Sequence, residues 1–265
     1  MVETLFKELS EIEQVEAIAL GGSRAGNMYD VKSDYDVYLY CTGEINENIR
    51  EKILKKYCKY IEIGNKFWEL EDNCTLNNGI DIDILYRNLD DFVKQIVNVV
   101  EDYNAYNGYT TCMWHNLRTC KIIYDENGRL QKAKERFEIK YPEKLKENII
   151  TQNMRLLYKA MPAYLYQVEK AVERGDIISI SHRVAAFMES YFDIIFAMNE
   201  MTHPGEKRLV QIVKKQCKII PDRFEENINC LFKKLYTQPE TANYHLMQMI
   251  KELEKCLNLK IGDVR

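Results

Sequence analysis

The sequence predicts an α+β protein in two parts, with strands and helices together in residues 1–138 and helices alone in residues 139–265. Short runs rich in β-branched and aromatic residues, bounded by glycine or polar turns, occur in the first part. In the second part, apolar residues recur at helical spacing. Eight of the eleven glycines lie at or before Gly128 and all five prolines at or after Pro142, so the residues that punctuate the chain divide in the same way.

Length and composition limit the classes of protein to consider. The chain has 265 residues, 46% of them hydrophobic and 29% charged, which is typical of a globular protein with one large domain or two modest ones. The net charge of −4 gives no overall basic field, so double-stranded nucleic acid and membranes are not expected partners. Eight cysteines without a C-x-x-C pair, and an N-terminus without the pattern of a signal peptide, favour reduced thiols in a cytoplasmic protein.

In the first part, three segments have the composition of strands. Residues 15–20 read VEAIAL and end at a Gly-Gly turn, residues 36–41 read DVYLYC, and residues 79–87 read GIDIDILYR. Residues 61–70 are weakly strand-like. The remaining predicted elements are helices at 3–14, 46–60 and 89–103, followed by a short helix and a strand within 111–124.

In the second part, proline and glycine mark the ends of the predicted helices. The first helix runs over 142–174, with a kink expected at Pro162 and an end at Gly175. Asp176 is suited to cap a second helix that reaches about residue 201. Three more helices are expected at 206–218, 221–236 and 239–258.

Two neighbouring segments of the first part contain residues that suit binding of phosphate and metal. The small-residue turn Gly21-Gly22-Ser23 follows a strand and can present backbone N–H groups and a hydroxyl to a phosphate. Asp34 and Asp36 are two residues apart at a strand start, so both carboxylates project from one face. A third carboxylate on a neighbouring strand would complete a Mg²⁺ site. Either pattern alone is typical of an ordinary turn or strand end, whereas their combination indicates a site for phosphate and metal.

These residues resemble the DNA polymerase β-like nucleotidyltransferase superfamily, whose signature is a Gly-Ser turn, a D-x-D strand start and a third carboxylate on a later strand. A mixed-sheet nucleotidyltransferase domain (1–138) followed by an all-α helical bundle (139–265) is similar to the two-domain antibiotic nucleotidyltransferases that act on aminoglycosides and lincosamides. The chain also resembles a bacterial subgroup of the superfamily whose substrate is not established. That second resemblance is carried by Trp114-His115-Asn116, Ser181-His182-Arg183 and the segment from His203 to Leu209.

The resemblance implies a role for each residue of the motif. Gly22 and Ser23 would hold the triphosphate, and Asp34 and Asp36 would bind one or two Mg²⁺ ions. The third carboxylate, both catalytic and a metal ligand, is expected at Asp83.

Two points are left open in this motif. Asp81 lies on the same strand face as Asp83 and is the alternative for its role, and either could take the acceptor proton. The family pattern Gly-Ser-x-Ala-Arg-Gly is replaced here by Gly-Ser-Arg-Ala-Gly-Asn, which moves the arginine to position 24. Contact of Arg24 with a phosphate is therefore an expectation that depends on this displaced position.

Further candidates lie in the second part. His203, Lys207 and Arg208 surround a predicted helix start and suit a triphosphate or an anionic acceptor. The alternative is a helix cap with a solvated basic turn.

Glu189 and Asp193 are four residues apart on a predicted helix, so they share a face and could bind an amino-sugar acceptor or supply a base. A solvated face or an internal salt bridge is the alternative. Glu206 is a third candidate for contact with the acceptor, which is expected to lie between the two parts.

Together these features predict Mg²⁺-dependent transfer of a nucleoside monophosphate, AMP from ATP in the first instance, to a hydroxyl of a small molecule such as an antibiotic. Pyrophosphate is the leaving group. Two alternatives remain open: a protein-AMPylating or antitoxin-like nucleotidyltransferase, and a catalytically silent nucleotide-binding regulatory module. The preferred nucleotide and the oligomeric state are open as well, with a homodimer as one expectation.

Overall fold

The structure is a computed structural model that describes residues 2–25, 33–67 and 69–258. The chain forms two compact units. The first unit comprises Met1–Val97 and Met113–Ile139, and the second comprises Asn98–Cys112 and Lys140–Arg265. The segment Asn98–Cys112 thus belongs to the second unit although it precedes part of the first. The division of the sequence into 1–138 and 139–265 has a single boundary and therefore assigns this segment to the first part.

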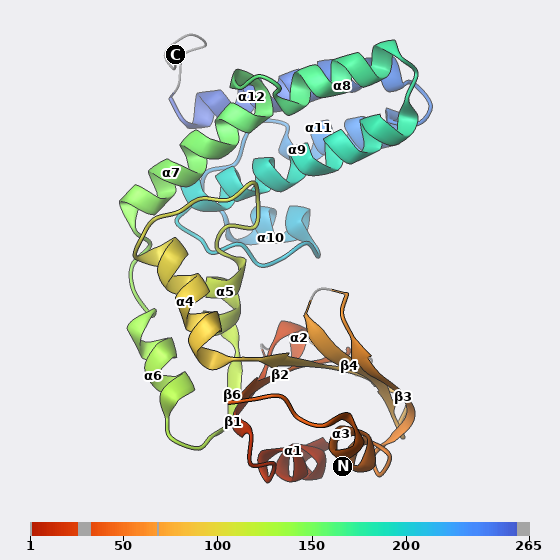
Figure 1. Cartoon of the computed structure of the whole chain (residues 1–265). Coiled ribbons are helices and arrows are strands. Elements are labelled where there is room, and N and C mark those ends of the chain that lie inside the picture. The colour runs from red at the N-terminus through yellow and green to blue at the C-terminus, as the bar shows by residue number, and fades with distance from the viewer. Residues whose placement is uncertain (1, 26–32, 68, 259–265) are drawn as a thin grey trace. The chain divides into compact units, whose positions relative to one another are not determined.

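A six-stranded sheet forms the centre of the first unit (Figure 1). Its strands are β1 (Val15–Leu20), β2 (Tyr35–Cys41), β3 (Cys58–Asn65), β4 (Leu70–Leu76), β5 (Asp81–Arg87) and β6 (Lys121–Asp125). They lie in the order β3-β4-β5-β2-β1-β6. The pair β2·β5 is parallel and the other neighbours are antiparallel. This mixed sheet, together with the many helices, confirms the predicted α+β fold class.

Helices accompany the sheet of the first unit. They are α1 (Val2–Ser10), α2 (Gly22–Ala25), α3 (Glu47–Leu54), α4 (Leu89–Val100), α5 (Cys112–Thr119) and α6 (Arg129–Arg136). Helices α1 and α3 lie against one face (Figure 1), where Val37 and Leu39 of β2 and Ile82 and Ile84 of β5 form part of the buried core. Because side chains alternate along a strand, the residues between them point to the other face.

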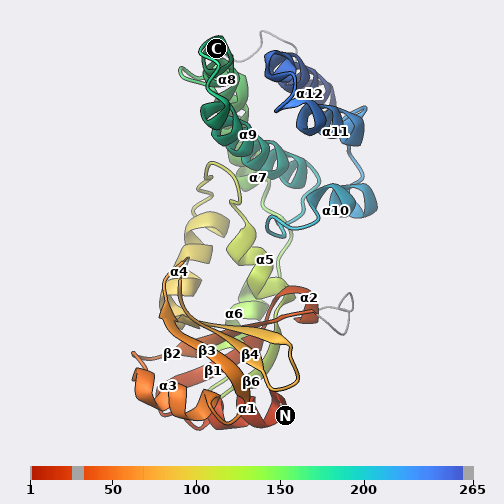
Figure 2. The same cartoon turned by 90° about the vertical axis from the view of Figure 1, so that its right-hand side faces the viewer.

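The second unit is helical in the part of the chain that the structure describes (Figure 2). Its helices are α7 (Glu143–Met154), α8 (Tyr164–Glu173), α9 (Ile177–Met198), α10 (Leu209–Gln216), α11 (Phe224–Lys234) and α12 (Ala242–Cys256), with a π-helical stretch at Arg155–Lys159 and a 3₁₀ turn at Pro239–Thr241. Helix α9 supplies much of the core, and α7 and α8 pack against it. The carboxylate of Asp176 caps α9 by accepting a hydrogen bond from the backbone N–H of Ser179, as the sequence predicts.

Several predicted elements differ from the observed ones. The helix expected over 46–60 ends at Leu54 because the chain enters β3 at Cys58. The helix expected over 142–174 is interrupted before α8, where Pro162 cannot donate a backbone hydrogen bond. Helix α6 was not predicted. No helix within the described residues is long and apolar enough to cross a membrane.

Strand β4 was hidden in the sequence by its polar residues. Asp72 points to the core side of the sheet and is fully buried, a position where an apolar residue is expected. Its carboxylate accepts hydrogen bonds from Arg50 Nη1 (2.5 Å), the backbone N–H of Gly64 (2.9 Å) and Tyr86 Oη (2.8 Å). Partners from three other segments therefore compensate its burial, and local sequence does not reveal them.

Candidate active site

Asp36 and Asp83 lie side by side on neighbouring strands. They are directly paired in the register of the parallel strands β2 and β5, whose backbones are about 4.8 Å apart in such a sheet. Both side chains are half-buried. They belong to the sheet face opposite the core that α1 and α3 cover, because their neighbours Val37, Ile82 and Ile84 point into that core. Two carboxylates that are far apart in the sequence thus meet on one face.

The Gly21-Gly22 turn packs directly on Asp36. The backbone N–H of Gly21 donates a hydrogen bond to the carbonyl of Asp36 (2.8 Å). Gly22 has a φ of +56°, and a Cβ on it would lie 1.8 Å from Oδ2 of Asp36. Only glycine allows the backbone to approach the carboxylate this closely and to adopt this conformation without strain. The small-residue turn and the Asp-x-Asp segment are therefore parts of one site.

Strand β4 adds polar side chains that the sequence analysis did not identify. Asn73 Nδ2 donates a hydrogen bond to Asp83 Oδ1 (2.8 Å), and Thr75 Oγ1 donates one to Asp81 Oδ1 (2.8 Å). Glu71, on the same strand face, is 7% exposed, and burial and then the negative charge of Asp83 raise its pKa. The period-two spacing of these three residues is the signal that could have identified them, but Asp72 obscured it.

Arg24 holds the start of β2. Its Nε donates hydrogen bonds to the carbonyls of Ser33 (2.6 Å) and Asp34 (3.1 Å), and its guanidinium lies 3.8 Å from the centre of the Tyr35 ring. Arg24 therefore positions the backbone that carries Asp34. Its contact with a phosphate remains a prediction.

Some parts of the predicted site are not gathered by the structure. Among the described residues, no three His, Cys, Asp or Glu side chains lie close enough together to hold a metal ion. Asp34 precedes β2 and is exposed, while Asp83 is hydrogen-bonded to Asn73. The side chain of Ser23, and the residues Gly26 and Asn27 of the predicted loop, lie outside the described residues.

Three of the candidates in the second unit line one pocket of about 550 Å³. They are Glu189 on α9, Glu206 before α10, and Arg208 at the start of α10. Lys207 is exposed. Contact of Lys207 or Arg208 with a triphosphate remains a prediction.

Asp193 lies inside the second unit rather than on the shared exposed face considered for it and Glu189. It is 1% exposed and accepts hydrogen bonds from the N–H (3.1 Å) and Oγ1 (2.6 Å) of Thr110 and from Asn153 Nδ2 (3.3 Å). Burial raises the pKa of Asp193 to about 7. The structure gives this carboxyl group a structural function, which is to fasten the segment Asn98–Cys112 to α9.

His203 is also an interior residue. It is fully buried and packs edge-on against the rings of Tyr109 and Phe196, with centroid distances of 4.7 and 4.9 Å. The helix that follows begins at Leu209, five residues after Pro204. The imidazole thus contributes to packing and does not lie at a helix start as the sequence suggested.

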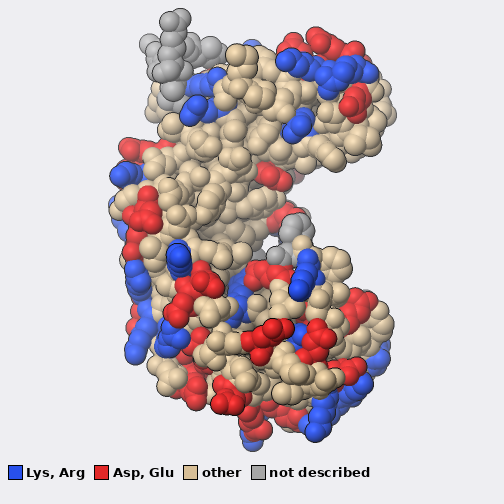
Figure 3. Space-filling view, in the orientation of Figure 1, with Lys and Arg blue, Asp and Glu red and all other residues tan. Residues whose placement is uncertain are grey.

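Charge on the first unit is mixed. In the face drawn in Figure 3, Lys and Arg side chains of this unit are interspersed with Asp and Glu. The site itself is rich in carboxylates: Asp36 on β2, Asp81 and Asp83 on β5, and Glu71 on β4 lie on the same face of the sheet. Carboxylate oxygens are the ligand type that divalent cations such as Mg²⁺ prefer.

Comparisons with known proteins give one partial family match and several structural similarities. Residues 109–209 match a family described as a domain of unknown function, DUF4037. No curated protein matches the chain.

Three similar solved structures cover most of the chain. A nucleotidyltransferase-like protein from Exiguobacterium sibiricum is 11% identical over 97% of this chain and 73% of that one, with a TM-score of 0.42. An aminoglycoside 6-adenyltransferase from Bacillus subtilis is 10% identical over 99% and 92%, with a TM-score of 0.32. The CCA-adding enzyme of Thermotoga maritima, solved with tRNA, is 12% identical over 97% and 80%, with a TM-score of 0.33.

Proposed function

We propose that this protein is a nucleotidyltransferase that moves a nucleoside monophosphate, AMP from ATP in the first instance, to a hydroxyl of a small molecule. The observation that carries the proposal is the pairing of Asp36 with Asp83 in the β2·β5 register, with Gly22 packed on the Asp36 carboxylate. A glycine turn can receive phosphate oxygens and carboxylates can bind a metal ion, and the structure brings both together on one sheet face.

Two carboxylates of the site have the chemistry of ligands for a divalent metal ion, although no third potential ligand among the described residues lies beside them. Asp36 of β2 and Asp83 of β5 supply carboxylate oxygens, the ligand type that Mg²⁺ prefers, and Asp34 lies just before β2. Because Gly22 has no side chain, its backbone lies directly against the carboxylate of Asp36. A bound Mg²⁺ would supply neutralisation of the triphosphate charge and a lower pKa for the acceptor hydroxyl.

The residues of the chain would then have distinct functions in the transfer. The acceptor oxygen forms a bond to the α-phosphorus, the bond from the α-phosphorus to the bridging oxygen breaks, and pyrophosphate leaves. Asp83, or Asp81 in its place, takes the proton of the hydroxyl. Asn73 orients Asp83 through its hydrogen bond, and Arg24 holds the backbone of Asp34.

The deciding experiment combines a substrate screen with variants. The protein is incubated with Mg²⁺, each of the four common nucleoside triphosphates and a panel of antibiotics and hydroxyl-bearing metabolites, and products are identified by mass spectrometry. An adduct heavier by one nucleoside monophosphate establishes the reaction. A nucleoside monophosphate attached to the protein itself would instead favour AMPylation. Nucleotide binding without any transfer would favour a regulatory module.

Matched variants test the site within that assay. We expect Asp36→Asn and Asp83→Asn to abolish transfer with the fold intact, because removing one of several adjacent like charges relieves repulsion in the metal-free protein. Asp102→Asn, which changes an exposed carboxylate of the second unit, is the control and should leave transfer unchanged. Full activity in Asp36→Asn would exclude the proposed site.

Asp81→Asn decides between the two carboxylates of β5. Asp83 faces Asp36 directly, whereas Asp81 is exposed at the end of the strand and bonded to Thr75. We therefore expect a much smaller loss of transfer from Asp81→Asn than from Asp83→Asn. The reverse order would assign the third carboxylate to Asp81.

A further inference from the structure

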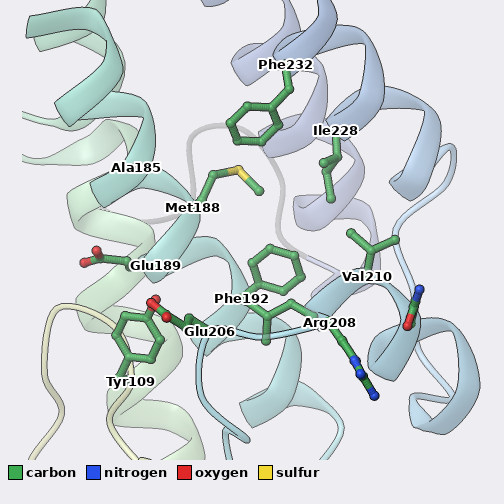
Figure 4. Close-up of a pocket in the computed structure, with 12 residues that line it drawn as sticks. Tyr109, Ala185, Met188, Glu189, Phe192, Glu206, Arg208, Val210, Ile228 and Phe232 are labelled. Carbon is green, nitrogen blue, oxygen red and sulfur yellow. The ribbon is translucent and has the colours of Figure 1, made fainter. Parts of the chain in front are cut away.

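The pocket of the second unit has an apolar wall and an acidic end (Figure 4). Met188 and Phe192 of α9 face Ile228 and Phe232 of α11 across it. Tyr109, Glu189 and Glu206 line its other end, where the figure shows the Tyr109 hydroxyl beside the Glu206 carboxylate and the Glu189 carboxylate on the outer side of α9. Its volume of about 550 Å³ is within the range of pockets that bind small organic molecules.

The acidic end carries negative charge that the protein does not neutralise. Neither Glu189 nor Glu206 forms an ion pair with any of the described residues. Burial raises the pKa of Glu189, and burial together with the charges of Glu189 and Glu206 raises the pKa of Tyr109. Arg208 also lines the pocket, but its guanidinium points away from both carboxylates in Figure 4. A positive group is therefore the complementary occupant of this end.

The backbone fixes the acidic end in place. Gly108 has a φ of +103° and lies against α9 so closely that a Cβ on it would be 2.7 Å from Cβ of Glu189. Thr110, two residues later, is bonded to Asp193 through both its N–H and its hydroxyl. Tyr109 between them has a φ of +53°, a conformation that costs free energy for a non-glycine residue. Its neighbours on both sides therefore hold Tyr109 in this conformation at the acidic end of the pocket.

We propose that this pocket binds an amphipathic organic cation, a molecule with an apolar aryl or alkyl body and one amino group. The body would lie against Met188, Phe192 and Phe232, and the ammonium group beside Glu206 and the Tyr109 ring, with the charge of Glu189 adding to the attraction. Anions are disfavoured by the two carboxylates. Polyhydroxylated amino sugars are disfavoured because the apolar wall offers no partners for their hydroxyl groups.

The test compares three probes with one body and different head groups: 4-phenylbutylamine, 4-phenylbutan-1-ol and 4-phenylbutyrate. Affinities for the full-length protein are measured by calorimetry without nucleotide or metal, so that the result is independent of the proposed transfer. We expect the amine to bind about tenfold more tightly than the alcohol, and the carboxylate to bind most weakly. Equal affinity for amine and alcohol, tighter binding of the carboxylate, or no saturable binding of the amine would each overturn the proposal.

Variants locate the binding within the pocket. Glu189→Gln and Glu206→Gln should each reduce the preference for the amine while leaving the affinity for the alcohol unchanged. Glu169→Gln, on the exposed side of α8, is the control and should change neither the preference nor the affinity. Phe232→Ala, at a side chain that is 47% exposed, should weaken all three probes without loss of the fold. Retention of the full amine preference in both glutamine variants would place the cation elsewhere and refute the assignment.

A spectroscopic readout checks the position independently. With ¹³C-methyl-labelled methionine, the signal of Met188 should shift on addition of the amine, and it is identified by its absence in Met188→Leu. A shift confined to other methionine signals would contradict the proposed location.

Discussion

Gly22→Ala is the sharpest test of the way in which the turn and the carboxylate form one site. The new Cβ would lie 1.8 Å from Oδ2 of Asp36, which real atoms do not tolerate. The carboxylate is the far end of a flexible side chain, so it can swing away at a low cost in stability. The substitution should therefore damage the function much more than the fold.

The magnitudes follow from the backbone and side-chain geometry. Alanine at a φ of +56° costs about 1 kcal/mol. Moving Asp36 out of its rotamer adds about 1 kcal/mol. Displacement of a metal-binding carboxylate by about 1 Å or more is expected to lower turnover by about 100-fold.

Gly128→Ala is the matched control, because Gly128 has a φ of +66° and a Cβ on it would meet nothing within 4 Å. It should lose about 1 kcal/mol of stability for the same backbone reason and keep full activity. Stability is measured by urea unfolding, transfer by formation of the nucleotidyl adduct, and Mg²⁺-ATP affinity by calorimetry. If Gly22→Ala transfers as well as Gly128→Ala, the turn does not position Asp36 for the reaction.

Three other predictions concern different parts of the chain. Asp193, whose pKa is raised to about 7, keeps its proton in the folded state at pH values where the unfolded chain has lost it, so stability should fall between about pH 4 and pH 7. Over this pH range, the free energy of unfolding of the wild type, measured with urea, should fall by about 2–4 kcal/mol relative to that of Asp193→Asn. If the unfolding free energies of the two proteins change with pH in parallel, the raised pKa is not that of Asp193. Arg24→Lys should lower turnover but leave Mg²⁺-ATP affinity unchanged, because lysine cannot hold the carbonyls of Ser33 and Asp34 as Nε does; a loss of affinity alone would assign Arg24 to the phosphate. Gly108→Ala should abolish the amine preference of the helical unit's pocket while leaving Mg²⁺-ATP affinity intact, which calorimetry with both ligands can check.

The local signals in the sequence were reliable where one segment determines its own structure. The alternating residues of β2 and β5 and the capping residue Asp176 of α9 gave elements close to those observed. They failed at β4, whose buried Asp72 is satisfied by Arg50 and Tyr86 from other segments. They also extended the helix after residue 46 through Cys58, because helical spacing alone does not show where β-sheet pairing takes over.

The sequence by itself determined the α+β class and the residue types of the candidate site, because strand alternation, glycine turns and acidic residues are properties of short segments. Only the tertiary structure decided which of these residues meet. The parallel β2·β5 register places Asp36 opposite Asp83, and β4 brings Asn73 to Asp83, although the sequence separates these residues by up to 47 positions. Tertiary structure also buried Asp193 and left Glu189 in a pocket, although both occupy one helix at a spacing that predicts a shared face. The physical reason is that burial depends on what packs against the helix, here the segment Asn98–Cys112, and that partner comes from elsewhere in the chain.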